Sequence, residues 1–198
     1  MRFVASSDTR IQTLGDTGSK RLTAMIKSAY AISEADEDYK NLDAVVISGD
    51  ITDNGLLGSF FAFAGITNNE IREGTQRLAV VAKAHDSYKY SYKSLDVFTE
   101  ATGQEPDFHR VIGGFHFIGV SRSKTRKHYS EDQIKWLDEN IAEAVEDDAQ
   151  KPVFVFQHEH VRDTVYGSSK TDGWGLDVFT EVLTKYPQSR NICFQIHI

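Results

Sequence analysis

Residues 44–55, with the sequence AVVISGDITDNG, place two acidic residues directly after a continuous apolar run. The run 44–48 is rich in β-branched residues and predicts a buried strand. Asp50 and Asp53 follow at its end. In α/β proteins ligands bind at the carboxyl ends of the strands, so these two carboxylates mark the sheet edge where a site is expected.

The same arrangement recurs at other positions along the chain. Further strands are predicted at 2–5, 78–82, 110–112, 115–120, 151–156 and 191–198. Five of the predicted strands are followed by, or end in, an aspartate or a histidine: Asp8, Asp50 with Asp53, His85 with Asp86, His158 with His160, and His197. This recurrence at one edge is the strongest functional signal in the sequence.

Each of these residues has an ordinary structural explanation when taken alone. An aspartate after a strand is commonly a turn or helix-capping residue, and a single histidine is commonly a surface or core residue with a satisfied ring. Turn chemistry has no need of histidine, however, so the coincidence favours a metal site. Carboxylate oxygens together with imidazole nitrogens suit Mn, Fe or Zn better than Ca or Mg.

The rest of the chain alternates predicted strands with predicted helices. Helices are expected at about 19–36, from Ser130 onwards where Gln133 completes a capping box, and at 176–183 before Pro187. Gly113-Gly114 between two apolar runs predicts a hairpin, which makes at least one sheet mixed. We therefore expect one α/β domain over residues 1–198. Because the sequence stops inside its last predicted strand, this domain is expected to be incomplete at its C-terminus.

Composition narrows the function classes. The chain has 198 residues with 40% hydrophobic and 26% charged residues, as in soluble globular proteins. A net charge of −7 argues against nucleic acid or an anionic membrane as partner, and the apolar runs are too short to span a bilayer. A phosphorylated substrate stays open because a metal can supply local positive charge. Cys193 is the only cysteine, which favours a reducing, cytoplasmic location.

Five short segments, SDTR, GDITDNG, KAHD, FQHEH and FQIHI, resemble in order and spacing the motifs of the calcineurin-like metallophosphoesterases. The resemblance covers nearly the whole chain. It implies an αββα sandwich of two mixed sheets flanked by helices. It also implies hydrolysis of a phosphate monoester or diester, such as a phosphorylated small molecule, by a hydroxide bound between two metals.

The resemblance also implies roles for individual residues. Asp8 would bind the first metal and Asp50 would bridge both metals, whereas His158 and His197 would bind the second. Asp53 is expected to support its loop rather than to bind metal.

His85 would contact the phosphoryl oxygen or protonate the leaving group, and Asp86 would orient it.

The sequence departs from the family pattern at several ligand positions. Arg10 stands where the family has a histidine ligand of the first metal, and Ala84 replaces an asparagine ligand of the second. Lys83 and Ile196 replace glycines, and the sequence ends before the family's last histidine. These departures predict one metal rather than two.

Two hypotheses remain for Arg10. In the first, its guanidinium lies near Asp8 and Asp50 and replaces the charge of the first metal. In the second, it points to solvent and the first metal site is vacant.

The sequence accordingly predicts a metal-dependent phosphoesterase whose activity is weak or lost. The alternative is a catalytically inactive relative that serves as a binding or partner module, and a third reading is a structural domain with one metal. The natural substrate, the choice between monoester and diester, and the oligomeric state are left open.

Overall fold

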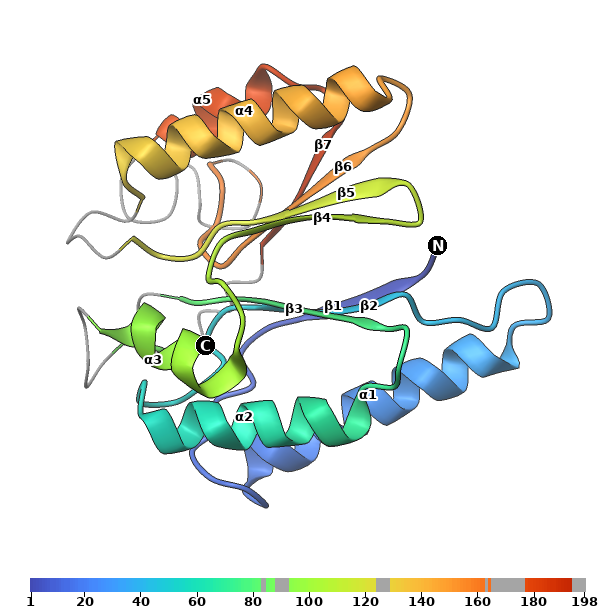
Figure 1. Ribbon diagram of the computed structural model, residues 1–198, viewed down its shortest axis with the longest axis vertical. Coiled ribbons are helices and arrows are strands. Elements are labelled where there is room, and N and C mark those ends of the chain that lie inside the picture. The colour runs from blue at the N-terminus through green and yellow to red at the C-terminus, as the bar shows by residue number, and fades with distance from the viewer. Residues whose placement is uncertain (83–84, 88–92, 124–128, 163, 165–176, 194–198) are drawn as a thin grey trace.

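A computed structural model describes the chain except for residues 83–84, 88–92, 124–128, 163, 165–176 and 194–198. Two sheets lie face to face in the middle of the molecule, and helices cover the outer face of each sheet (Figure 1). The architecture is the αββα sandwich that the sequence predicts.

The first sheet is parallel and has the order β1-β2-β3. Its strands are β1 (Phe3–Ser6), β2 (Ala44–Ser48) and β3 (Gln76–Val80). Three helices cover its outer face, namely α1 (Thr17–Ala35), α2 (Leu57–Glu70) and α3 (Ser94–Thr102) (Figure 1). All five residues of β2 are buried, since both faces of this central strand are covered.

The second sheet is mixed and has the order β4-β5-β6-β7. Its strands are β4 (Phe108–Ile112), β5 (Phe115–Gly119), β6 (Val153–Gln157) and β7 (Ser189–Cys193), with α4 (Glu131–Asp147) and α5 (Val178–Thr184) on the outer face. Strands β4 and β5 form the predicted antiparallel hairpin, and Gly113 and Gly114 in its turn have φ values of 58° and 76°. The other pairs are parallel.

The sequence-based prediction of two mixed sheets needs a correction. Among the described strands only the second sheet is mixed, because its β4–β5 hairpin brings in an antiparallel strand. The first sheet is built from strands joined by helical crossovers, which keep all its strands parallel.

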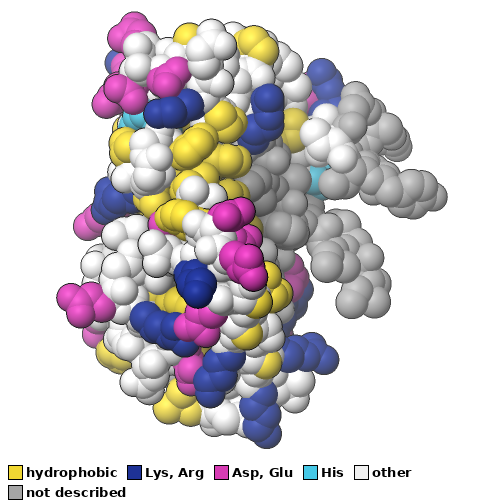
Figure 2. All heavy atoms as spheres, turned by 90° about the vertical axis from the view of Figure 1, so that its right-hand side faces the viewer, with side chains coloured by type: hydrophobic (Ala, Val, Ile, Leu, Met, Phe, Trp, Pro, Cys, Tyr) yellow, Lys and Arg dark blue, Asp and Glu magenta, His cyan; other side chains and the backbone are white. Residues whose placement is uncertain are grey.

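Apolar side chains fill three layers. One cluster lies between the first sheet and its helices, one between the second sheet and α4 and α5, and one between the two sheets. The middle layer is aromatic: the rings of Phe117 and Phe156 stack with centroids 5.6 Å apart, and Phe3 meets Phe117 edge-on at 5.1 Å. On the face drawn in Figure 2, a group of hydrophobic side chains is visible between the middle and the upper part of the molecule.

The predicted helices are present at nearly the expected bounds. Helix α4 begins with the predicted capping box, in which the Ser130 side chain accepts from the Gln133 N–H and the Gln133 side chain accepts in return from the backbone of Ser130. Helices α2 and α3 were not predicted. None of the helices in the described part of the chain is long and apolar enough to cross a bilayer.

The two sheets are joined by hydrogen bonds at the carboxyl ends of β2 and β6. The Ser48 hydroxyl donates to the carbonyl of Gln157 at 2.6 Å. The next residue, Gly49, has a φ of 85°, and a Cβ atom built there would lie 2.6 Å from the Cβ of His158. The close approach of the two strand ends therefore requires a glycine at this position.

We expect Gly49→Ala to lower the free energy of unfolding by about 2 kcal/mol or more, because the methyl group meets the His158 side chain and the backbone conformation disfavours alanine. Urea unfolding would measure this. Gly65→Ala, in α2 and with nothing within 4 Å of an added Cβ, is the matched control. The control is expected to be neutral or to stabilise by about 0.5–1 kcal/mol. Equal effects of the two substitutions would contradict the steric explanation.

Candidate metal centre

The segments after β1 and β2 continue side by side beyond the sheet. The N–H groups of Asp8, Arg10 and Ile11 donate to the carbonyls of Gly49, Asp50 and Ile51, respectively, at 3.0–3.1 Å. These three hydrogen bonds fix the two segments in register, so that Asp8, Arg10 and Asp50 all lie at the same edge of the sandwich.

The backbone at this edge is strained. Asp8, Arg10 and Asp50 have φ values of 54°, 51° and 49°, and they are the non-glycine residues with positive φ in the described chain. Such conformations cost of order 1–3 kcal/mol each and are concentrated at functional sites. The strain here aims two carboxylates and a guanidinium toward one another.

Three of the predicted metal ligands are brought together. Asp8, Asp50 and His158 each offer a ligand atom, and these atoms lie within 4.8 Å of one another. Asp50 and His158 are buried, whereas Asp8 is half-buried. The fourth predicted ligand, His197, and the substituted position Ala84 lie outside the described residues.

The ring of His158 is oriented by the end of β2. Its Nδ1 atom lies 2.8 Å from the carbonyl oxygen of Ser48. Since a carbonyl only accepts, Nδ1 carries a proton, and Nε2 is the ring nitrogen left to bind a metal. Nε2 faces Oδ1 of Asp50 at 3.6 Å. A histidine whose second nitrogen is fixed by a backbone carbonyl is the usual arrangement of a metal ligand.

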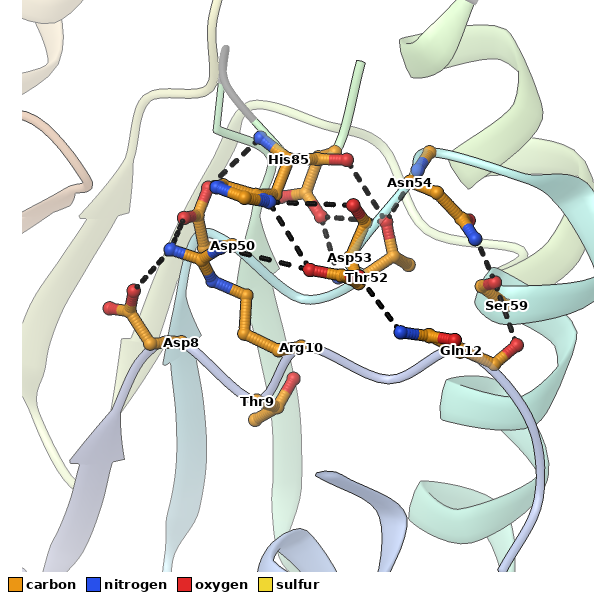
Figure 3. Close-up of polar contacts among 12 residues, drawn as sticks. Asp8, Thr9, Arg10, Gln12, Asp50, Thr52, Asp53, Asn54, Ser59 and His85 are labelled. Carbon is orange, nitrogen blue, oxygen red and sulfur yellow. Dashed lines mark hydrogen bonds and ion pairs between the residues drawn. The ribbon is translucent and has the colours of Figure 1, made fainter. Parts of the chain in front are cut away.

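Arg10 lies between the two carboxylates (Figure 3). Its Nη2 atom is 2.8 Å from Oδ2 of Asp50 and 3.3 Å from Oδ1 of Asp8. The Asp50 side chain is only 3% exposed, so this ion pair compensates a buried negative charge. This placement is the one expected if the guanidinium substitutes for the charge of the first metal. That role itself remains a prediction.

The same guanidinium is not fully satisfied. Its Nε atom is buried without a hydrogen-bond partner in the described part of the chain. A buried N–H without a partner costs about 1–3 kcal/mol, so the position of Arg10 is set by the carboxylates rather than by complete hydrogen bonding.

The carboxylate next to the ring of His85 is that of Asp53, not Asp86. Nδ1 of His85 lies 3.4 Å from both Oδ1 and the backbone oxygen of Asp53. Gln12 donates to the other oxygen of Asp53 at 2.9 Å, and Nη1 of Arg10 lies 3.8 Å from Oδ1. Asp53, expected from the sequence only to support its loop, therefore links His85 with Arg10 (Figure 3).

Asp86 points into the protein interior and is fully buried. Its carboxylate accepts from the N–H groups of Thr52 and Ala82 at 2.7 and 2.9 Å. It therefore ties the segment after β2 to the end of β3. Burial raises the pKa of Asp86 to about 6, and the negative charge of Asp50 adds to this shift, although the backbone hydrogen bonds act against it.

Sequence reasoning missed the contributions of Thr52 and Gln12. The Thr52 hydroxyl accepts from the Gly55 N–H at 2.9 Å and so closes the turn that carries Asp53. Both residues act through contacts with segments more than thirty residues away in the sequence. No local pattern in the sequence signals such contacts.

Among the described residues, the donor atoms on the two sides of Asp50 differ in what they already contact. Oδ2 of Asp50 and Oδ1 of Asp8 already contact the guanidinium of Arg10, and Oδ2 of Asp8 accepts from the Ser7 hydroxyl at 2.6 Å. A cation between these carboxylates would face the charge of Arg10. Oδ1 of Asp50 and Nε2 of His158 converge on the other side, where a single divalent cation could be held.

No protein-family model matches the sequence, and a comparison with curated proteins gives no match either. Among solved structures, the fold is similar to that of a purple acid phosphatase isolated from seeds of yellow lupin (Lupinus luteus), with a TM-score of 0.68 and 13% sequence identity. The chain therefore shares the fold of this phosphatase over nearly its whole length. The alignment covers 99% of this chain and 38% of the lupin protein, so the chain spans well under half of that protein's length. At this identity the similarity establishes the fold and leaves the activity to be argued from the site.

We expect Asp86 to hold its proton up to about pH 6. Because its folded-state pKa is raised from 3.8, the folded state retains a proton that the unfolded state has released, so the free energy of unfolding falls as the pH rises from about 4 to 6. Carbon-13 NMR of the side-chain carboxyl would show the titration. Asp16 is the internal reference: hydrogen bonds from Ser19, Thr13 and Gln12 outweigh its burial and lower its pKa to about 2. Titration of Asp86 near pH 4 would contradict the expectation.

Proposed function

We propose that the chain is a phosphoesterase-type hydrolase that uses one divalent transition metal, Mn, Fe or Zn, and acts on a phosphate monoester or diester. The observation that carries the proposal is the convergence of Asp50 Oδ1 and His158 Nε2, 3.6 Å apart, with the ring fixed by the Ser48 carbonyl. His197 is the further ligand expected from the sequence. The similarity of the fold to that of a purple acid phosphatase supports the reaction class.

The metal would supply a Lewis acid that polarises a phosphoryl oxygen and acidifies water. Arg10 holds a permanent positive charge beside Asp8 and Asp50, which limits the negative charge that a phosphate group meets on entry. Arg10 and the metal thus have different tasks, because a guanidinium cannot acidify water.

His85 is suited to handle the proton of the leaving group. Hydrolysis forms a bond between a water oxygen and phosphorus and breaks the bond from phosphorus to the alcohol, whose oxygen then needs a proton. The ring of His85 is 38% exposed, and Nδ1 is held near Asp53. In the described part of the chain Nε2 has no hydrogen-bond partner, and this nitrogen would deliver the proton.

The alternative function, an inactive domain that serves as a binding or partner module, is favoured by the same arginine. In that case Arg10 would stabilise the buried carboxylates for the sake of the fold alone, and no metal would be needed. The two functions differ in metal content and turnover, which can be measured on the chain as it is.

For the hydrolase we expect about one equivalent of bound metal, and turnover of a nitrophenyl phosphate ester that depends on added Mn²⁺. His158→Gln should abolish metal retention, because it removes an imidazole ligand, whereas the matched control His160→Gln should retain the metal. His85→Gln should keep the metal and lower kcat by about 10²–10⁴-fold. Elemental analysis after dialysis and steady-state kinetics are the measurements. A folded protein without metal and without turnover would support the inactive module instead.

A second prediction concerns the charge of Arg10. Arg10→His should raise the bound metal above one equivalent, because it adds a ligand beside Asp8 and Asp50 and removes the opposing charge. Arg10→Met removes the charge without adding a ligand, and it should lower the free energy of unfolding in metal-free buffer by about 1–3 kcal/mol. If the two variants bind the same amount of metal as the parent chain, Arg10 does not occupy the place of a metal.

A further inference from the structure

Two histidines outside the candidate metal centre form a hydrogen-bonded pair on the outer face of the second sheet. His109 lies in β4 and His116 in β5, and both reach α4. Nδ1 of His109 lies 2.7 Å from Oδ1 of Asn140, Nε2 of His109 lies 2.7 Å from Nδ1 of His116, and Nε2 of His116 lies 3.2 Å from Oδ2 of Asp147. The four side chains are thus connected by a continuous series of three contacts.

The atoms at both ends of this series of contacts, Oδ1 of Asn140 and Oδ2 of Asp147, are hydrogen-bond acceptors. The amide of Asn140 is oriented by its own donor, because Nδ2 donates to the carbonyl of Trp136 at 2.7 Å, so Oδ1 faces His109. At the other end the Asp147 carboxylate can only accept when it is ionised. Each terminal ring nitrogen must therefore carry a proton.

The contact between the two rings also needs a proton, and this settles the charge of the pair. Three contacts require three protons on the four ring nitrogens. Two neutral imidazoles carry one proton each and supply only two. Whichever ring donates to the other, the complete chain of contacts needs one additional proton, which makes the pair singly positive.

We propose that the His109–His116 pair is a pH-sensitive clasp, which holds α4 on the β4–β5 hairpin while it carries exactly one extra proton. The clasp consists of this pair together with its two partners on α4, Asn140 and Asp147. The inference does not depend on the proposed function, because none of its residues belongs to the candidate metal centre.

We expect the extra proton on His116, because this ring is the one in contact with a carboxylate. Burial lowers the pKa of His109, and Arg110 on the same strand opposes a charge there, although the hydrogen bond to Asn140 and the carboxylate of Glu143 on α4 favour it. His116 lies directly against the carboxylate of Asp147. The charged groups that face the pair are thus Arg110 from β4, and Glu143 and Asp147 from α4.

Departure from one extra proton in either direction breaks a contact. Loss of the proton at higher pH leaves a bare nitrogen opposite an acceptor at one of the contacts. Gain of a second proton at lower pH places two N–H groups against each other across the 2.7 Å contact between the rings. The clasp therefore contributes most to stability in the pH range where the pair holds one extra proton, and its contribution declines on both sides.

Nitrogen-15 NMR of the histidine rings tests the proton count directly. At pH 7 we expect His109 to be protonated at Nδ1 alone and His116 at both nitrogens, which gives three ring protons for the pair. Two ring protons in total at pH 7, with the protein folded, would overturn the proposal.

A pair of variants tests the coupling to Asp147. Asp147→Asn keeps an acceptor and removes the charge, so the extra proton should be lost at a pH about one unit lower than in the parent chain. Glu146→Gln, the same change of charge at the neighbouring exposed position, should leave this titration in place. Equal shifts in the two variants would mean that the overall negative charge of the protein, and not the contact with Asp147, keeps the extra proton bound. That result would overturn the proposal.

Discussion

The candidate centre depends on the compensation of one buried negative charge, that of Asp50. This carboxylate is 3% exposed and lies near a second buried carboxylate, Asp86. An ionised carboxylate in such a place is costly unless a positive charge or several donors face it. Arg10 supplies the charge for Asp50, and backbone N–H groups together with a raised pKa accommodate Asp86. The paired backbone segments after β1 and β2 hold the arginine where it is needed.

The two carboxylate oxygens of Asp50 have different partners because of this charge compensation. Oδ2 belongs to the guanidinium of Arg10, and Oδ1 faces the imidazole of His158. A site that relied on two metals would place a cation on each side. Here the guanidinium of Arg10 already occupies one side, and among the described residues the donors on the other side are those that face His158. The ion pair and the proposed metal therefore do not compete for the same oxygen.

The sandwich, and the meeting of Asp8, Asp50 and His158 at one edge of it, were predictable because both rest on local patterns. Apolar runs such as that of β2 mark strands, and the acid or histidine after each run falls at one sheet edge whatever the details of packing. Helix α2 escaped prediction since its phenylalanines and alanines surround the helix instead of forming a stripe, and its first turn has no side-chain cap. The partners of His85 and Asp86 were not predictable either. The two residues are adjacent in sequence, yet one side chain turns to the surface and the other turns inward to Thr52, a residue 34 positions away.

The groups on the two sides of Asp50 come from different halves of the chain. Asp8, Arg10 and Asp50 lie in the segments that follow β1 and β2 of the first sheet, within the first fifty residues. His158 meets Ser48 across 110 positions of sequence and arrives with the second sheet. Arg10 and Asp50 both lie within the first fifty residues, so the buried carboxylate and its counter-ion come from the same half of the chain. The ion pair at Asp50 therefore requires no residue of the second sheet.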